Sequence, residues 1–147
     1  MSKQIKMDFI EPRDIFLSIR PNFANLIARR EKTYEFRRCK PKDPVKKLWL
    51  YVTSPVSELK YIAEVGDVVE HPTQIPEDGI GNADFNKGLK VSKFGFPIIH
   101  LDELAEGIPI SELRDRFNFN SPQGFIYTDT FPELVNYVKS CEIRRLY

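Results

Sequence analysis

Cysteine is scarce in this sequence: the 147 residues contain two, Cys39 and Cys141, and no Cys-x-x-Cys pair. Two distant cysteines form neither the disulfide framework of a small secreted domain nor the ligand spacing of a zinc site. No run approaches the roughly 18 apolar residues that a membrane-spanning helix needs. The first residues contain no apolar stretch typical of a signal peptide. We therefore expect a cytoplasmic protein with no metal, no cofactor and no membrane contact.

Glycine is sparse as well, with seven residues against eleven prolines, which indicates short elements joined by rigid turns. A chain of this length is typical of one domain and buries about 68–70% of the surface that its unfolded form exposes. Its 41% hydrophobic and 29% charged residues are those of an ordinary globular protein. We expect one domain over residues 15–147, preceded by a loosely held N-terminal segment over residues 1–14.

The net charge of +1 conceals a strong local imbalance. Between Arg29 and Lys47 there are nine basic residues and three acidic ones, whereas the rest of the chain has 13 basic and 18 acidic residues. Such asymmetry favours an anionic partner at one face of the molecule. A charge run by itself is more often a solvated loop, so the inference needs support from other residues.

The periodicity of apolar residues predicts an α+β fold, a small and partly open β-barrel with short helices packed outside. Alternation predicts strands at 15–20, 33–38, 48–52, 59–69, 97–101 and 125–127, and an edge strand at 141–147. Helical spacing predicts a short helix after Pro21, a second with Ser111 as its N-cap, and a third that begins with a capping box at Thr130. Residues 71–90 are expected to form a long loop, which is uncommon without a functional reason.

Aromatic side chains interleave with the basic segment, a pattern typical of proteins that stack single-stranded nucleic acid. We expect Tyr34 and Phe36 to fill the barrel core. Trp49 and Tyr51 fall on the face opposite Leu48, Leu50 and Val52, which makes these two rings the better candidates for contact with a ligand.

Residues 17–38, LSIRPNFANLIARREKTYEFRR, resemble the opening of ASCH domains, a branch of the PUA-like superfamily. That opening is a strand ending in Ser-Ile-basic-Pro, a short helix, and then Gly-x-Lys-x-x-Glu-x-Arg. Lys32, Glu35 and Arg37 match the last three named positions, and Arg30 replaces the glycine. Two later segments, at 51–55 and 121–127, are similar to further ASCH segments. The resemblance implies a PUA-like barrel that holds nucleic acid or a nucleotide.

The residues of this motif have a physical interpretation of their own. Glu35 and Arg37 are two residues apart on a strand and share a face, and Lys32 lies at the preceding turn. Together they can bind a phosphate and read a base edge, although an ordinary ion pair worth at most about 1 kcal/mol would use the same residues. The predicted binding residues are Arg20, Lys32, Glu35, Arg37, Arg38, Lys40, Tyr51 and Ser54, with Lys42, Lys46 and Lys47 adding positive charge beside them.

We therefore expect a domain that binds RNA or a modified nucleotide, and two alternatives stay open. ASCH relatives include an amidohydrolase acting on an acetylated cytidine and ribonucleases, and the resemblance to the amidohydrolase implies a lysine, a threonine nucleophile and a glutamate. Lys32 matches the lysine, but Glu35 stands where the threonine would be, so no catalytic residue is assigned. The first alternative is a hydrolase using Lys32 and Glu35. The second is an interaction module whose basic loop meets an acidic protein.

Overall fold

The computed structural model describes residues 10–147, so residues 1–9 of the predicted N-terminal segment lie outside it. The strands are β1 (Arg13–Ile19), β2 (Tyr34–Arg37), β3 (Val45–Val52), β4 (Glu58–Val65), β5 (Val69–Glu70), β6 (Phe94–Pro109), β7 (Phe125–Tyr127) and β8 (Ile143–Arg145). The helices are α2 (Pro21–Ala28), α3 (Asn82–Asn86), α4 (Ile110–Phe117) and α5 (Pro132–Ser140), with a 3-10 turn at Thr128–Thr130. None of these helices is long and apolar enough to cross a membrane.

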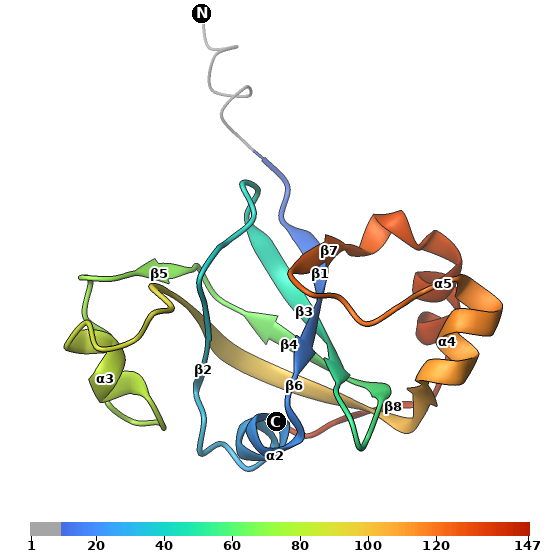
Figure 1. Cartoon of the computed structure of the whole chain (residues 1–147), viewed down its shortest axis with the longest axis horizontal. Coiled ribbons are helices and arrows are strands. Elements are labelled where there is room, and N and C mark those ends of the chain that lie inside the picture. Colours follow the sequence, from blue (N-terminus) through green and yellow to red (C-terminus); the bar gives the residue numbers. More distant parts are fainter. Residues whose placement is uncertain (1–9) are drawn as a thin grey trace, which may run out of the picture.

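The strands form one curled, mixed sheet in the order β2-β6-β4-β3-β1-β7, with β5 and β8 also paired to β6. β1 and β3 run parallel, and the other pairs are antiparallel. α4 and α5 lie together on one side of the sheet, and α3 lies at its far end beside β5 (Figure 1). This half-barrel with short outer helices confirms the predicted α+β architecture. β1 begins at Arg13, inside the segment that was expected to precede the domain.

Two apolar clusters on opposite faces of β1 and β3 hold the sheet in shape. The cluster inside the half-barrel includes Ile15 and Leu17, and the cluster under α4 and α5 includes Phe16. Trp49 and Tyr51 belong to the outer cluster and are 3% and 4% exposed. The expectation that these two rings face a ligand is therefore wrong: the alternation was correct, but their face of β3 is covered by helices.

The orientation of β2 is the reverse of the one expected. Glu35 points into the half-barrel and is buried, whereas Tyr34 and Phe36 lie on the other face and are only half-buried. The Phe36 ring stacks on Phe85 of α3, with ring centres 5.2 Å apart. Alternation of residue types shows that a strand has two different faces, but not which face points inward. Here the segment around α3 packs over the face that carries Tyr34 and Phe36.

Three other local predictions change. β6 runs for 16 residues, far beyond the strand expected at 97–101, and pairs with four other strands. α4 begins after Pro109 rather than after an N-cap Ser111, and α5 has Phe131 at its N-cap with no side-chain cap bond, so the capping box at Thr130 does not form. The helix after Pro21 is confirmed, with Pro21 in its first turn.

Candidate functional site

β1 and β2 are not paired with each other, and polar side chains connect them instead. We call this boundary of the half-barrel the seam. β2 pairs with β6, and β1 pairs with β3 and β7. Arg37 Nη2 donates a hydrogen bond of 2.6 Å across the seam to the backbone oxygen of Ser18. The Ser18 hydroxyl in turn donates to the backbone oxygen of Pro122 at 2.6 Å. One chain of contacts therefore joins β2, β1 and the loop before β7.

Glu35 is the centre of the predicted cluster and brings its three members together. Its carboxylate accepts a hydrogen bond from Arg37 Nε at 2.8 Å and lies 3.6 Å from Lys32 Nζ. The side chains of Lys32 and Glu35 are each 8% exposed. A buried carboxylate is stable in its charged form when cations neutralise it, and Glu35 has one on each oxygen.

Lys32 approaches Glu35 between two aromatic rings. Its ammonium lies 4.8 Å from the centre of the Phe36 ring and 5.5 Å from that of Phe23, at cation–π distance. Burial lowers the pKa of Lys32 below its ordinary value, and it outweighs the opposing attraction of Glu35. Lys32 lines a separate cavity together with Tyr34 and Asp78.

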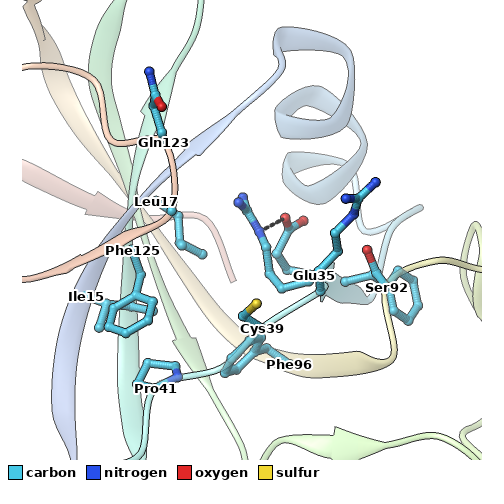
Figure 2. Close-up of a pocket in the computed structure, with 13 residues that line it drawn as sticks. Ile15, Leu17, Glu35, Cys39, Pro41, Ser92, Phe96, Gln123 and Phe125 are labelled. Carbon is cyan, nitrogen blue, oxygen red and sulfur yellow. Dashed lines mark hydrogen bonds and ion pairs between the residues drawn. The ribbon is translucent and has the colours of Figure 1, made fainter.

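A pocket of about 400 Å³ opens at the seam, and we call it the seam pocket. Figure 2 shows the apolar side chains of β1 and β7 facing Glu35 across it, with Cys39 and Phe96 between. The walls come from distant parts of the chain: Ile15, Leu17, Glu35, Phe36, Arg37, Arg38, Cys39, Pro41, Ser92, Phe96, Gln123, Gly124 and Phe125. The pocket therefore combines apolar walls with a neutralised carboxylate and the guanidinium of Arg37.

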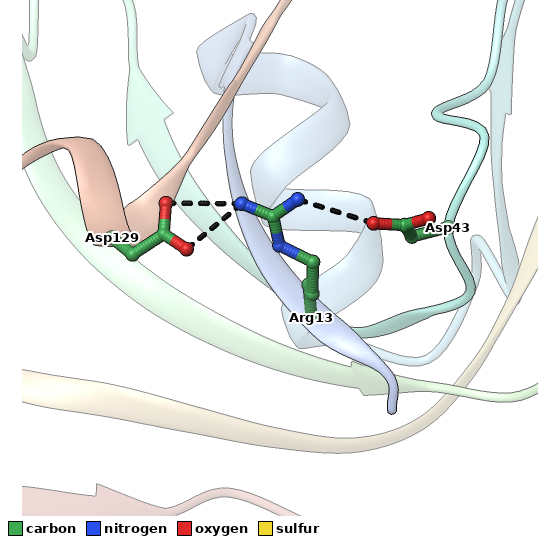
Figure 3. A network of polar contacts seen from close by, with 3 residues as sticks. All are labelled: Arg13, Asp43 and Asp129. Carbon is green, nitrogen blue, oxygen red and sulfur yellow. Dashed lines mark hydrogen bonds and ion pairs between the residues drawn. The ribbon is translucent and has the colours of Figure 1, made fainter. Parts of the chain in front are cut away.

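Arg13 fixes two walls of this pocket to each other at the start of β1. Its guanidinium donates to Asp43 at 3.1 Å and to Asp129 at 2.8 Å, as Figure 3 shows. It also lies 3.4 Å from the centre of the Tyr127 ring. Asp43 belongs to the basic segment, whereas Asp129 and Tyr127 belong to β7 and the turn after it. Arg13 therefore sets the spacing between the segment that carries Cys39 and the strand that carries Phe125.

Segment 38–44 keeps most of its positive charge free. All three acidic residues of the basic run are engaged: Glu31 with Arg29, Glu35 in the cluster, and Asp43 with Arg13. Arg38, Lys40 and Lys42 are exposed and form no ion pair within residues 10–147. Unpaired surface cations at the mouth of a pocket attract anionic ligands. Among the described residues, no three His, Cys, Asp or Glu side chains are grouped so as to hold a metal ion.

Not every predicted binding residue lies at the seam pocket. Glu35, Arg37 and Arg38 line it, and Lys40 lies next to it. Four others do not line it: Lys32 lines the separate cavity near Asp78, Arg20 is exposed at the N-cap of α2, Tyr51 is in the outer core, and Ser54 is in the turn after β3.

The sequence reasoning did not assign Gln123, Phe125 and Ser92 to the pocket. The ASCH-like segment 121–127 was the available signal for Gln123 and Phe125. The sequence contains no comparable signal for Ser92, which reaches the pocket at the end of the long connection between β5 and β6.

The backbone at Arg30 gives a reason for the glycine of the ASCH motif. Arg30 has a φ of 63°, in the left-handed region that glycine adopts without strain. Its guanidinium lies 4.2 Å from the centre of the Tyr147 ring, a contact that a glycine could not make.

Comparison with known proteins identifies the fold. No protein-family model and no curated protein sequence matches the chain significantly. Three crystal structures of an ASCH protein from Zymomonas mobilis do match at the level of structure. The protein itself is 22% identical with a TM-score of 0.66, and the match covers 90% of this chain and 98% of that one. A Tyr-to-Phe mutant is 20% identical with a TM-score of 0.69, covering 88% and 99% of the two chains.

A Ser-to-Ala mutant of the same protein is 20% identical with a TM-score of 0.70, covering 91% and 100% of the two chains. At identities this low, the structural similarity shows a shared fold and no more. The predicted resemblance to the PUA-like fold of ASCH domains is confirmed at that level.

Proposed function

We propose that this chain binds single-stranded RNA or a modified nucleotide in the cytoplasm, with one base in the seam pocket. The observation that carries the proposal is the position of a buried, neutralised carboxylate in the wall of an otherwise apolar pocket beside unpaired surface cations. An apolar slot with a few convergent polar groups is the usual form of a small-ligand site. A volume of about 400 Å³ lies within the range of such sites.

The polar groups of the pocket suit the edge of a base. Each oxygen of a carboxylate can accept two hydrogen bonds, so Glu35 keeps acceptor capacity after its contacts with Arg37 and Lys32. Carboxylates accept from the exocyclic amines of bases, and a guanidinium donates to ring nitrogens and carbonyl oxygens. The ring of Phe125 and the side chains of Ile15 and Leu17 offer apolar surface to the base face.

The free charges of segment 38–44 suit the phosphate backbone. Each phosphate neutralised by a lysine or arginine releases bound counterions, so affinity falls as salt rises. Lys40 and the equally exposed Lys139 on α5 make a matched pair, because only Lys40 is near the seam pocket. We expect Lys40→Ala to reduce the slope of log affinity against log salt by about one, and Lys139→Ala to leave it unchanged.

The two cysteines provide a direct test of where the ligand binds. Cys39 is exposed and lines the seam pocket, whereas Cys141 lies at the end of α5 and donates through Sγ to the Tyr137 backbone oxygen. In a Cys141→Ser variant, the rate of reaction of Cys39 with a thiol reagent reports on the pocket alone. We expect single-stranded RNA to slow that reaction at low salt.

Labelling of Cys141 in a Cys39→Ser variant serves as the control and should not respond to RNA. RNA binding that leaves Cys39 fully reactive would place the ligand elsewhere and contradict the proposal. If the basic segment meets an acidic protein instead, RNA should leave Cys39 fully reactive, and free nucleotides should not compete with that protein.

Hydrolysis is a second candidate, because Lys32 has a lowered pKa and lies 3.6 Å from Glu35. A lysine whose pKa is lowered gives up its proton more readily, and its neutral amine can act as a general base. Incubation with labelled RNA and with acetylated cytidine tests this candidate. Turnover that disappears in a Lys32→Met variant would support a hydrolase, and the absence of turnover would favour binding alone.

A further inference from the structure

A second pocket lies directly beside the seam pocket and shares two residues of its wall with it. It measures about 260 Å³ and lies between segment 40–45 and the turn that joins β4 to β5. Pro41 and Phe96 line both pockets. Cys39 faces the seam pocket, and the next residue, Lys40, faces the second pocket. A ligand that passes over Pro41 can therefore occupy both pockets.

The chemistry of the second pocket resembles that of the first. Val68 and Phe96 supply apolar surface, and Lys40 and Lys42 supply two cations that form no ion pair within residues 10–147. The carboxylate of Asp43 accepts a hydrogen bond from Arg13 at 3.1 Å, and Arg13 also pairs with Asp129. Asp67 is exposed at the rim and offers a hydrogen-bond acceptor. Two exposed lysines therefore lie next to an apolar slot, the arrangement that a phosphate followed by a base requires.

We propose that the second pocket is a subsite for the neighbouring nucleotide, so that the preferred ligand is a single-stranded oligonucleotide of at least two nucleotides rather than a free nucleotide. This inference rests on the proposed function, because it takes the first base to occupy the seam pocket. The phosphate between the two bases then lies near Pro41, within reach of Lys40, and the second base lies against Val68 with Lys42 beside it.

The basic run between Arg29 and Lys47 provides a strict control for this subsite. Lys42 and Lys46 are both exposed lysines of the same basic run, but Lys42 lines the second pocket and Lys46 lines neither pocket. Removal of either lysine lowers the net charge equally. A general electrostatic attraction therefore predicts similar losses of affinity for Lys42→Ala and Lys46→Ala, whereas a subsite predicts a larger loss for Lys42→Ala.

The experiment measures the binding of three kinds of probe to the full chain at fixed salt: the four nucleoside 5′-monophosphates, the four 3′-monophosphates, and the four homodinucleotides. Each is assayed by protection of Cys39 in the Cys141→Ser background, in which the cysteine reports on the seam pocket. We expect the best dinucleotide to bind about tenfold tighter than the best mononucleotide. We expect Lys42→Ala to remove most of that advantage, because it lowers the affinity for dinucleotides more than the affinity for mononucleotides, and Lys46→Ala to lower both affinities to a similar extent and retain the advantage.

The outcomes separate the two proposals. Dinucleotides that bind no tighter than mononucleotides, or equal losses for the two lysine variants, would overturn the subsite and leave the seam pocket standing. Failure of every probe to protect Cys39 would overturn the proposed function and the subsite with it. Thermal unfolding of both variants checks that their folds are intact, which we expect because both side chains are exposed.

Discussion

The outer face of the sheet, under α4 and α5, and the seam between β1 and β2 hold the same domain together by different means. On the outer face, Phe16 of β1 makes edge-to-face contact with Trp49 of β3 and with Phe119, which follows α4, and β1 and β3 are paired with each other. At the seam the ladder is interrupted, and the contacts are an arginine bonded to a backbone oxygen and a buried carboxylate between two cations.

The difference shows where this fold can accept a ligand. A close-packed aromatic layer has no room for one, and any rearrangement would cost contacts throughout the layer. Polar groups at the seam keep spare hydrogen-bonding capacity because each has more lone pairs or protons than the fold uses. The seam therefore leaves polar atoms available to a partner.

Phe119→Ala tests the outer face and should have the largest effect on stability. Phe119 is completely buried, with its ring centre 4.9 Å from that of Phe16 and 5.2 Å from that of Phe131. Removal of the ring leaves a cavity, and we expect a loss of about 3–5 kcal/mol in the free energy of unfolding. Urea denaturation measures it. The reactivity of Cys39 should stay the same in the folded variant, and a change there would mean that the two regions are coupled.

Glu35→Gln tests the seam and should have the next largest effect on stability. The variant keeps the shape of the side chain but leaves the buried ammonium of Lys32 without its counter-charge. Truncating one partner of a buried pair costs about 3 kcal/mol, and the same urea assay measures this loss. Unlike Phe119→Ala, this change should also weaken ligand binding. A variant as stable as the parent would show that Lys32 is neutral in the folded protein.

Ser18→Ala removes the bond that ties β1 to the loop before β7. Its hydroxyl donates to the Pro122 oxygen at 2.6 Å, and Ser140 on α5 makes a bond of the same length to Tyr137. Ser18 is partly buried and Ser140 is exposed, so we expect a loss of about 1 kcal/mol for Ser18→Ala and little for Ser140→Ala. Thermal unfolding compares the two. Faster labelling of Cys39 in the Ser18 variant alone would confirm that this bond shapes the pocket.

The pH dependence of Lys32 should give the smallest effect. Because burial lowers its pKa from 10.5, the unfolded chain binds more protons than the folded one just below that pH. The free energy of unfolding attributable to Lys32 therefore rises as the pH increases toward 10.5. Tyr34, Tyr61 and Tyr147, whose pKa values are raised by burial, act in the opposite direction above their ordinary pKa of 10.0.

The difference between the parent and a Lys32→Met variant isolates the lysine from these tyrosines. We expect the free energy of unfolding of the variant to lack the increase toward pH 10.5. At neutral pH it should lie within about 1 kcal/mol of the parent value, since Arg37 still pairs with Glu35. Parallel pH profiles for the two proteins would contradict the lowered pKa of Lys32.

Much of the architecture followed from the sequence, because strands and helices with one buried face leave a period. The strand at 125–127, the helix after Pro21 and the open barrel were predicted in this way. The full length of β6 was not, because its glycines and prolines interrupt the alternation. The division at residue 14 stays a prediction.

The candidate site was predicted in part. The ASCH-like motif identified Lys32, Glu35 and Arg37, and the structure brings them together. The motif could not show that Lys32 lines a different cavity from Glu35, nor that Tyr51 is buried in the outer cluster. Both facts depend on which elements pack over each face of the sheet. Sequence periodicity reports that a face is covered but not by what.

The segment around α3 links two sides of the candidate site. Glu70 and Phe94 are paired across β5 and β6, so the two ends of this segment are held together at the sheet. Residues 71–93 between them also support β2 from its outer face, because Phe85 stacks on Phe36 and the Ile80 N–H donates to the backbone oxygen of Glu31. Ser92, near the end of the same segment, lines the seam pocket. A change of sequence in this segment would therefore reach the pocket by two routes, directly at its wall and indirectly through the strand that carries Glu35.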